Sequence, residues 1–241
     1  MALATVGTVA ACGGDAAEES LVVSAAASLD GAFTEIAAVF EDQHPGNDVL
    51  LNFAGSSTLR EQILEGSPVD VFASANISNM DAVVEAGEVS GQSEVFALNR
   101  LQIAVPAGNP AGVESLADFS DEALLIGLCA AGVPCGDFAR ETLALAGVHP
   151  AIDSDEPDVR ALLTKIAEGE IDAGITYITD IAASGDDVDG IEIPDDVNVL
   201  AEYPIATVAS TASPEAAAAF VELVLSETGQ AILRGHGFAS P

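Results

Sequence analysis

The chain has 241 residues, of which 49% are apolar, so it can bury one large core or two modest ones. Its 39 acidic and 6 basic side chains give a formal net charge of -33, which excludes nucleic acid and anionic membrane surfaces as partners. The acidic residues are spread along the sequence, which favours a solvated surface over a site for a cationic partner and leaves adaptation to high salt open.

The N-terminal residues form a short apolar run of small side chains that ends at Cys12 and then turns acidic. This run resembles a bacterial lipoprotein signal, in which Cys12 would be the lipid anchor. Basic residues are missing from its start, so a start further upstream and a simple disordered leader remain alternatives. We predict a signal and linker over residues 1–20, and a lipid-anchored extracytoplasmic protein in the periplasm or on the outer face of the cell membrane. No later apolar stretch is long enough for a membrane-spanning helix.

From residue 21 onward, short apolar segments alternate with helical patterns, as is typical of a parallel α/β sheet. Strands are predicted at 21–26, 49–53 and 69–73, each followed by a helix. In the second helix, Thr58 and Glu61 have the spacing of a capping box, which predicts a helix start at this point.

A stretch rich in Pro and Gly at 106–110 follows a predicted strand at 98–106, and we expect the chain to cross into a second lobe there. The alternation of strands and helices then restarts. The later predicted elements are strands at 124–128, 171–178 and 203–209, helices at 137–145 and 159–167, and a final helical region that begins at 213–215.

Three turns rich in Ser, Gly or Pro lie where a predicted strand ends and a helix begins, and they contain Ser28, Ser56 and Cys135. Such turns present backbone N–H groups and a positive helix end to an anion, and in an open α/β sheet they face the ligand crevice. Taken alone, each of these turns is weak evidence for an anion-binding site. A Ser before a helix is usually its cap, Tyr177 after an apolar strand is more often a core ring, and Val159 is ordinary core.

Two cysteines, Cys129 and Cys135, are separated by five residues that include Gly132 and Pro134, which suits a tight loop. A disulfide between them is plausible in an oxidising compartment. A zinc half-site and two inert thiols are the alternatives, and the three scattered histidines give zinc little support.

Ordered motifs run from residue 21 to residue 238. They are AAASL at 25–29, FAGSSTLREQI at 53–63, PVDVFASA at 68–75, MD at 80–81, VPCG at 133–136, DVR at 158–160, GITY at 174–177, EYPIA at 202–206 and GF at 237–238. Together they resemble the periplasmic molybdate-binding proteins of ABC transporters. A set of motifs in order over the whole body is far more specific than any single turn.

The resemblance implies an α/β fold of the two-lobed type II periplasmic-binding class. Each lobe would be a mainly parallel sheet flanked by helices, with the ligand cleft between the lobes. Residues 21–101 and 205–241 would form lobe 1, and residues 102–204 would form lobe 2.

The resemblance also implies the ligand residues. Ser28 and Ser56 would each supply a hydroxyl and a backbone N–H, Tyr177 its phenol, and Cys135 and Val159 their backbone N–H groups. The oxyanion would be held by these hydrogen bonds, with no metal ion coordinated directly by the protein and no cofactor.

Three positions near this predicted site need comment. Gly55 stands where the family commonly has Ser, which removes one hydroxyl. Asp30 lies in the first turn of the first helix, where a carboxylate that pointed inward would repel an anion, so we expect it to point to solvent. Arg160 is interpreted as a structural ion-pair partner rather than an anion ligand.

These features predict a monomeric solute-binding protein, not an enzyme, that captures molybdate and tungstate and delivers them to an ABC permease. The alternatives are a binding protein for another oxyanion such as sulfate, which differs by size alone, or a hydrolase that uses a helix-capping Ser. A hydrolase has little support, because the chain lacks a G-x-S-x-G elbow and a histidine beside a site turn. Phosphate is disfavoured because a partly protonated anion needs an acceptor.

Overall fold

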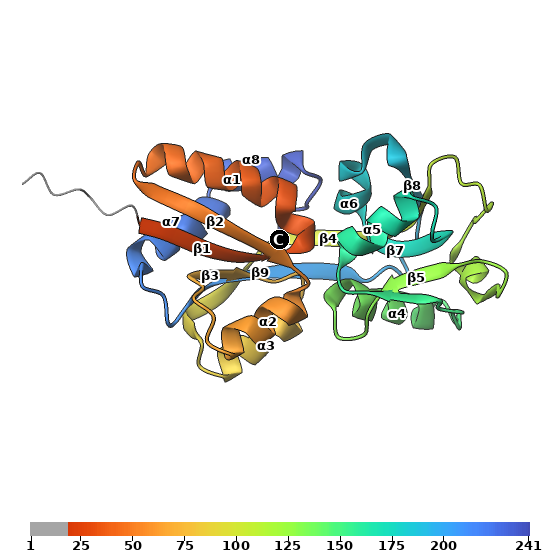
Figure 1. Cartoon of the computed structure of the whole chain (residues 1–241), viewed down its shortest axis with the longest axis horizontal. Coiled ribbons are helices and arrows are strands. Elements are labelled where there is room, and N and C mark those ends of the chain that lie inside the picture. The colour runs from red at the N-terminus through yellow and green to blue at the C-terminus, as the bar shows by residue number, and fades with distance from the viewer. Residues whose placement is uncertain (1–18) are drawn as a thin grey trace, which may run out of the picture.

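The computed structural model describes residues 19–241, so the predicted signal and Cys12 lie outside the described residues. Figure 1 shows two lobes that lie side by side along the long axis of the molecule. Two strands connect them, β4 (Val89–Pro106) and β9 (Leu200–Val208).

The first lobe is built on a mixed sheet in the order β2-β1-β3-β9-β4. Its own strands are β1 (Glu19–Ala26), β2 (Asn47–Ala54) and β3 (Val71–Ala73). β1 is parallel to β2 and β3, whereas β9 is antiparallel to β3 and β4.

Helices cover both faces of this sheet (Figure 1). One face carries α1 (Asp30–Gln43), α7 (Pro214–Leu225) and α8 (Glu227–Gly235), and the other carries α2 (Ser56–Leu64) and α3 (Ile77–Glu85). The buried side chains beneath α2 and α3 form a small apolar cluster of their own, separate from the main core.

The second lobe contains β5 (Ile126–Cys129), β6 (Ser154–Glu156), β7 (Ala173–Tyr177) and β8 (Val188–Glu192). β5 is parallel to β6 and β7, and both β7 and β8 are antiparallel to β4. The helices of this lobe are α4 (Pro134–Leu145), α5 (Val159–Ala167) and α6 (Ile178–Ala183).

The chain passes from the first sheet to the second within β4. Up to Arg100 this strand pairs with β9, and from Leu101 it pairs with β7. The crossing expected at 106–110 is therefore wrong: that stretch is a turn at the far end of β4, with φ angles of 74° at Gly108 and 46° at Asn109. A strand that continues through two cores needs no turn residues, so its sequence does not mark the crossing point. The predicted boundaries of the two lobes remain a prediction.

Two further elements differ from the sequence prediction. Helix α2 begins at Ser56 with Gly55 as N-cap and no side-chain capping bond, so the predicted capping box at Thr58 and Glu61 is wrong. The final helical region is two helices, α7 and α8, separated at Ser226 and bent by 60°. Among the described helices none alone has the length and apolar character needed to span a bilayer; α7 and α8 meet those criteria only as a bent pair.

Candidate anion-binding site

The five predicted ligand residues line one pocket between the lobes. Ser28 and Ser56 come from the first lobe, and Cys135, Val159 and Tyr177 come from the second. The free volume of this pocket is about 10 Å³, which is room for about one water molecule. Residues separated by more than a hundred positions in the sequence thus meet at one small pocket.

The first lobe contributes two turns that lie at the carboxyl ends of neighbouring parallel strands. Ser28 belongs to the short 3-10 helix Ala27–Leu29, which follows β1, and Ser56 is the first residue of α2, which follows β2. Because β1 and β2 are parallel and adjacent, their ends meet at one edge of the sheet.

Neither serine caps its helix. The Ser28 hydroxyl lies 3.0 Å from the Tyr203 hydroxyl, and the Ser56 hydroxyl accepts a hydrogen bond of 3.0 Å from the backbone N–H of Ala75. The alternative that these serines are only caps is therefore not realised in this structure. Since Ser56 Oγ accepts from an amide, its own hydrogen is available to a ligand.

Gly55 is required by the approach of the two lobes. A Cβ at this position would lie 2.6 Å from the carbonyl oxygen of Pro157, across the pocket. The φ of Gly55 is -59°, which any residue can adopt, so the constraint is steric and comes from the opposite lobe. Glycine at position 55 thus allows a closer contact between the lobes than a residue with a Cβ would.

The second lobe contributes two helix N-termini, whose first backbone N–H groups have no acceptor within the helix. Cys135 follows Pro134, which has no N–H, so the amide of Cys135 is the first donor of α4. Asp158 caps α5 by accepting from the backbone N–H groups of Arg160 at 2.9 Å and Ala161 at 3.0 Å. This cap leaves the amide of Val159 for the pocket.

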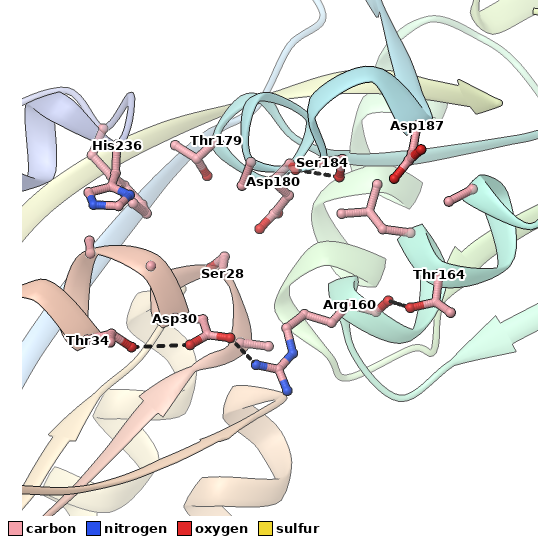
Figure 2. Close-up of a pocket in the computed structure, with 17 residues that line it drawn as sticks. Ser28, Asp30, Thr34, Arg160, Thr164, Thr179, Asp180, Ser184, Asp187 and His236 are labelled. Atoms are coloured by element: carbon pink, nitrogen blue, oxygen red, sulfur yellow. Dashed lines mark hydrogen bonds and ion pairs between the residues drawn. The ribbon is translucent and has the colours of Figure 1, made fainter. Parts of the chain in front are cut away.

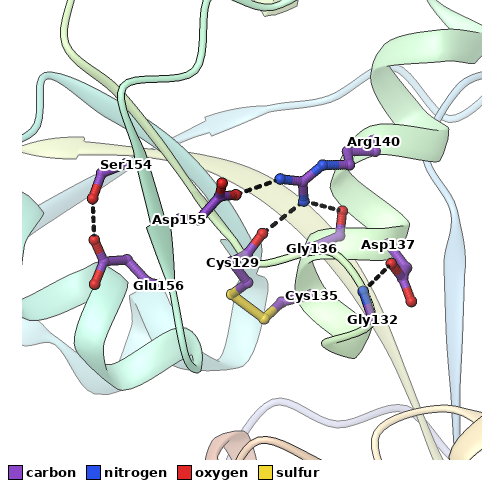
Figure 3. A network of polar contacts seen from close by, with 9 residues as sticks. All are labelled: Cys129, Gly132, Cys135, Gly136, Asp137, Arg140, Ser154, Asp155 and Glu156. Carbon is purple, nitrogen blue, oxygen red and sulfur yellow. Dashed lines mark hydrogen bonds and ion pairs between the residues drawn. A yellow bond between two sulfur atoms is a disulfide. The ribbon is translucent and has the colours of Figure 1, made fainter. Parts of the chain in front are cut away.

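A polar network holds the turn that carries Cys135 (Figure 3). A disulfide joins Cys135 at the start of α4 to Cys129 at the end of β5. The Arg140 side chain donates to the carbonyls of Cys129 at 2.6 Å and Gly136 at 3.0 Å, and it pairs with Asp155 at 2.5 Å. The two sulfurs are bonded to each other, and no group of three or more His, Cys, Asp or Glu side chains is placed for a metal ion in residues 19–241.

Tyr177, the last residue of β7, is 1% exposed. Within the described part of the chain its hydroxyl has no hydrogen-bond partner, although it lines the pocket. Burial raises the pKa of the Tyr177 phenol well above its ordinary value, and Tyr203 and Asp180 nearby raise it further. The phenol therefore keeps its proton and can donate it to an anion.

A larger cleft of about 570 Å³ adjoins this pocket on the side of α1 and α6 (Figure 2). Across it, Asp30 of α1 forms an ion pair with Arg160 of α5 and accepts from Thr34 at 3.4 Å. Asp30 does not line the anion pocket and its side chain is 45% exposed, so it points away from the proposed ligand as expected, and in addition an arginine of the opposite lobe pairs with it. Arg160 forms an ion pair, as expected.

Asp180 of α6 is a buried carboxyl in this cleft, 7% exposed, and Figure 2 shows its side chain projecting from α6 into the cleft. Its Oδ2 has no hydrogen-bond partner among the described residues. Burial raises the pKa of Asp180 to about 7, against a lowering effect of the Tyr177 backbone N–H and with a smaller raising effect of Asp158.

Comparisons with known proteins identify the family of this chain. Residues 21–239 match the family described as bacterial extracellular solute-binding protein. The molybdate-binding protein ModA of Mycobacterium tuberculosis H37Rv is 39% identical over 222 residues, which cover 92% of this chain and 85% of that protein. The chain belongs to the ModA family. ModA of Haemophilus influenzae is 29% identical, with 93% of this chain and 92% of that protein covered.

Solved structures with low sequence identity to this ModA-family chain have the same two-lobed α/β fold, which confirms the predicted fold class. The periplasmic molybdate-binding protein of Azotobacter vinelandii superposes with a TM-score of 0.81 at 20% identity, covering 92% of this chain and 99% of that one. The sulfate-binding protein SubI of Mycobacterium tuberculosis superposes with a TM-score of 0.83 at 18% identity, covering 92% and 87%.

Sequence reasoning missed three buried polar residues of this ModA-family chain beside the pocket: Asn99, Asp180 and Tyr203. Tyr203 lies inside the EYPIA motif, which was noted without a role for its hydroxyl. Asp180 stands at the third position of α6, where an acid can reach back to the helix start, so its spacing from Tyr177 is a signal that could have been used. Asn99 has no comparable signal, because its partners are distant in the sequence.

Proposed function

We propose that this ModA-family chain is an extracytoplasmic solute-binding protein that captures molybdate, and tungstate with it, and delivers the anion to an ABC permease. Its ligand residues would be Ser28, Ser56, Cys135, Val159 and Tyr177. The relatives named as molybdate-binding proteins support this proposal. The observation that carries it is the buried Tyr177 hydroxyl, which has no partner among the described residues and lines a pocket of helix N-termini.

The chemistry of these donors suits a fully ionised tetrahedral anion. Every oxygen of such an anion accepts hydrogen bonds, and the proposed groups, which are backbone amides, two serine hydroxyls and a protonated phenol, can all donate. One carboxylate, Asp158, lines the pocket, and its Oδ1 accepts from two backbone N–H groups of α5. Neutral donors and helix dipoles hold the anion without a formal positive charge, which also favours its release.

The same contacts argue against an enzyme. A serine nucleophile needs a base to take its proton. Ser28 instead bonds to Tyr203, Ser56 bonds to a backbone amide, and His236 in the adjoining cleft bonds to Glu35. We infer that these hydroxyls bind rather than attack, and that no cofactor takes part.

In the proposed cycle the anion enters while the lobes are apart, and closure brings donors of both lobes onto it. The closed, monomeric form would then dock on the permease. Lipidation at Cys12 would keep the protein close to that permease.

Isothermal titration of the purified protein with molybdate, tungstate, sulfate and phosphate tests the proposal. We expect tight binding of molybdate and tungstate, which these donors do not distinguish, and weak binding of the other two. Tight binding of sulfate with weak binding of molybdate would assign the alternative oxyanion. Absence of binding to all four by a folded sample would contradict the proposal.

A further inference from the structure

A chain of buried hydrogen bonds runs from the anion pocket through both crossing strands to the second lobe. Ser28 Oγ lies 3.0 Å from Tyr203 Oη, and Asn99 Nδ2 donates to Tyr203 Oη at 3.4 Å and to Thr179 Oγ1 at 2.8 Å. Tyr203 is fully buried, and Asn99 and Thr179 are each 4% exposed. The chain therefore connects Ser28 to the place where β4 passes between the two sheets.

The orientation of the Asn99 amide is determined by the backbone. The N–H of Arg100 donates to Asn99 Oδ1 at 2.9 Å, and a backbone N–H can only donate. The oxygen of the amide must therefore face Arg100, and Nδ2 must face the two hydroxyls. An amide nitrogen has two hydrogens and no acceptor capacity, so both Tyr203 and Thr179 are acceptors toward Asn99.

The Asn99 amide can only donate to Tyr203, so the hydrogen of the Tyr203 phenol needs another partner. Burial raises the pKa of Tyr203 well above its ordinary value, so its phenol has one hydrogen to donate. Among the described residues Ser28 Oγ is the acceptor within hydrogen-bond distance of Tyr203 Oη, so that hydrogen is directed to Ser28. Ser28 then accepts from Tyr203, and its own hydrogen is left for the pocket that it lines.

We propose that Asn99 and Tyr203 are positioning residues that make Ser28 a donor toward the bound anion. The proposal rests on the proposed function and adds to it the way in which one ligand hydroxyl is oriented. We call the chain of hydrogen bonds from Asn99 through Tyr203 to Ser28 the relay. A Ser28 that accepts from Tyr203 has its single hydrogen free for an oxygen of the anion.

A double-mutant cycle on the purified full chain tests the relay. Ser28→Ala and Tyr203→Phe should each weaken molybdate binding about 5- to 20-fold, as expected for loss of one buried hydrogen bond. Because Tyr203 acts only through Ser28, adding Tyr203→Phe to Ser28→Ala should change the affinity less than about 2-fold. Additive effects in the double variant would overturn the proposal. The phenylalanine keeps the ring contacts to Phe96 and Phe238, so the variant should fold.

Thr179→Val is the matched control, because it removes the other hydroxyl that accepts from Asn99. It should change molybdate affinity less than about 2-fold, whereas Tyr203→Phe should lower it at least about 5-fold. A general loosening of the crossing strands would lower the affinity of both variants alike, and that result would overturn the proposal.

A second pair of variants tests the amide donor of Asn99 directly. Asn99→Asp replaces only Nδ2 by an acceptor oxygen, and it should weaken molybdate binding at least as much as Tyr203→Phe does. Asn198→Asp adds the same charge beside the same strand, at a side chain that bonds to the backbone of Leu101, and it should weaken binding less than 3-fold. Equal losses of molybdate affinity in the two variants would contradict the proposed role of Asn99 as a donor to Tyr203.

The outcome for the unmodified protein separates the two proposals. If it binds another oxyanion of the panel in place of molybdate, the proposed function fails, and the double-mutant cycle is then measured with that anion to test the relay. If it binds molybdate and the effects of Ser28→Ala and Tyr203→Phe are additive, the relay fails and the proposed function stands. Absence of binding to every oxyanion overturns both.

Discussion

At the scale of single residues, the pocket and the adjoining cleft contain polar atoms without hydrogen-bond partners among the described residues. The Tyr177 hydroxyl and Asp180 Oδ2 are buried without hydrogen-bond partners among the described residues. An unsatisfied buried polar group costs about 1–3 kcal/mol, so it lowers the stability of the ligand-free protein unless a ligand or another group satisfies it. At Tyr177, which lines the pocket, stability and binding should therefore respond in opposite directions to removal of the hydroxyl.

Tyr177→Phe removes the unpartnered hydroxyl and keeps the ring that packs against Tyr203. We expect the free energy of unfolding of the ligand-free protein to rise by about 1 kcal/mol and molybdate affinity to fall about 10-fold. Denaturant unfolding and calorimetric titration measure the two quantities. A variant that loses stability while it keeps its affinity would remove Tyr177 from the site.

Asp180→Asn tests the buried carboxyl. Its pKa is about 7 in the folded protein, raised by burial from an ordinary 3.8. Between these values the folded protein keeps a proton that the unfolded chain has lost, so this group's contribution to stability falls as pH rises from about 4 to about 7 and is constant above. The variant lacks this dependence.

The stability of Asp180→Asn relative to the unmodified protein should therefore increase across that window, by on the order of 1 kcal/mol per pH unit. Urea unfolding of both proteins between pH 4 and pH 8 measures the difference. Asp187→Asn, which removes an exposed carboxylate from the same cleft, controls for loss of charge. A constant difference between pH 4 and pH 7 would show that Asp180 is ionised in the folded protein.

At the scale of elements, the site consists of helix starts that two sheets hold at fixed places. The turn at Ser28 follows β1, and the turn at Ser56 follows the parallel neighbour β2. On the other side, the disulfide and Arg140 hold the start of α4 against the end of β5. The donors are therefore positioned before a ligand arrives, which lowers the entropy lost on binding.

Gly55→Ala should prevent complete closure, since its Cβ would lie 2.6 Å from the carbonyl oxygen of Pro157. We expect molybdate affinity to fall at least 10-fold, or about 1.4 kcal/mol, while the unfolding free energy of the ligand-free protein stays almost constant. Gly235→Ala is the control, because a Cβ there meets nothing within 4 Å. Equal affinity in the two variants would mean that the lobes do not need this contact.

At the scale of the whole molecule, the negative charge opposes the approach of an anion. Five of the six Lys and Arg side chains, namely Arg60, Arg100, Arg140, Arg160 and Lys165, already form ion pairs with carboxylates. Most of the 39 acidic side chains therefore have no cationic side chain to pair with. Local helix dipoles can hold an anion in the pocket, but the surrounding field repels it at longer range.

The association rate of molybdate should therefore increase with ionic strength, contrary to the usual effect on oppositely charged partners. The screening length falls from about 10 Å at 0.1 M salt to about 3 Å at 1 M, which shortens the repulsion. The chain has 2 tyrosines and no tryptophan, and both tyrosines lie at the pocket or beside it, so stopped-flow tyrosine fluorescence can follow binding. A rate that decreases with salt would show that local positive potential dominates the approach.

The sequence by itself determined the class of fold and predicted which groups would act as donors. Alternating strands and helices, together with turns of Ser, Gly or Pro before helices, are local features, and the ordered motifs contain the five predicted ligand residues, which line one pocket. Only the tertiary structure decided where β4 crosses, why position 55 is glycine, and which partners Asp30 and Ser28 have. These depend on contacts such as Ser28 with Tyr203 or Asp30 with Arg160, which are 175 and 130 residues apart, and no local pattern encodes such pairs.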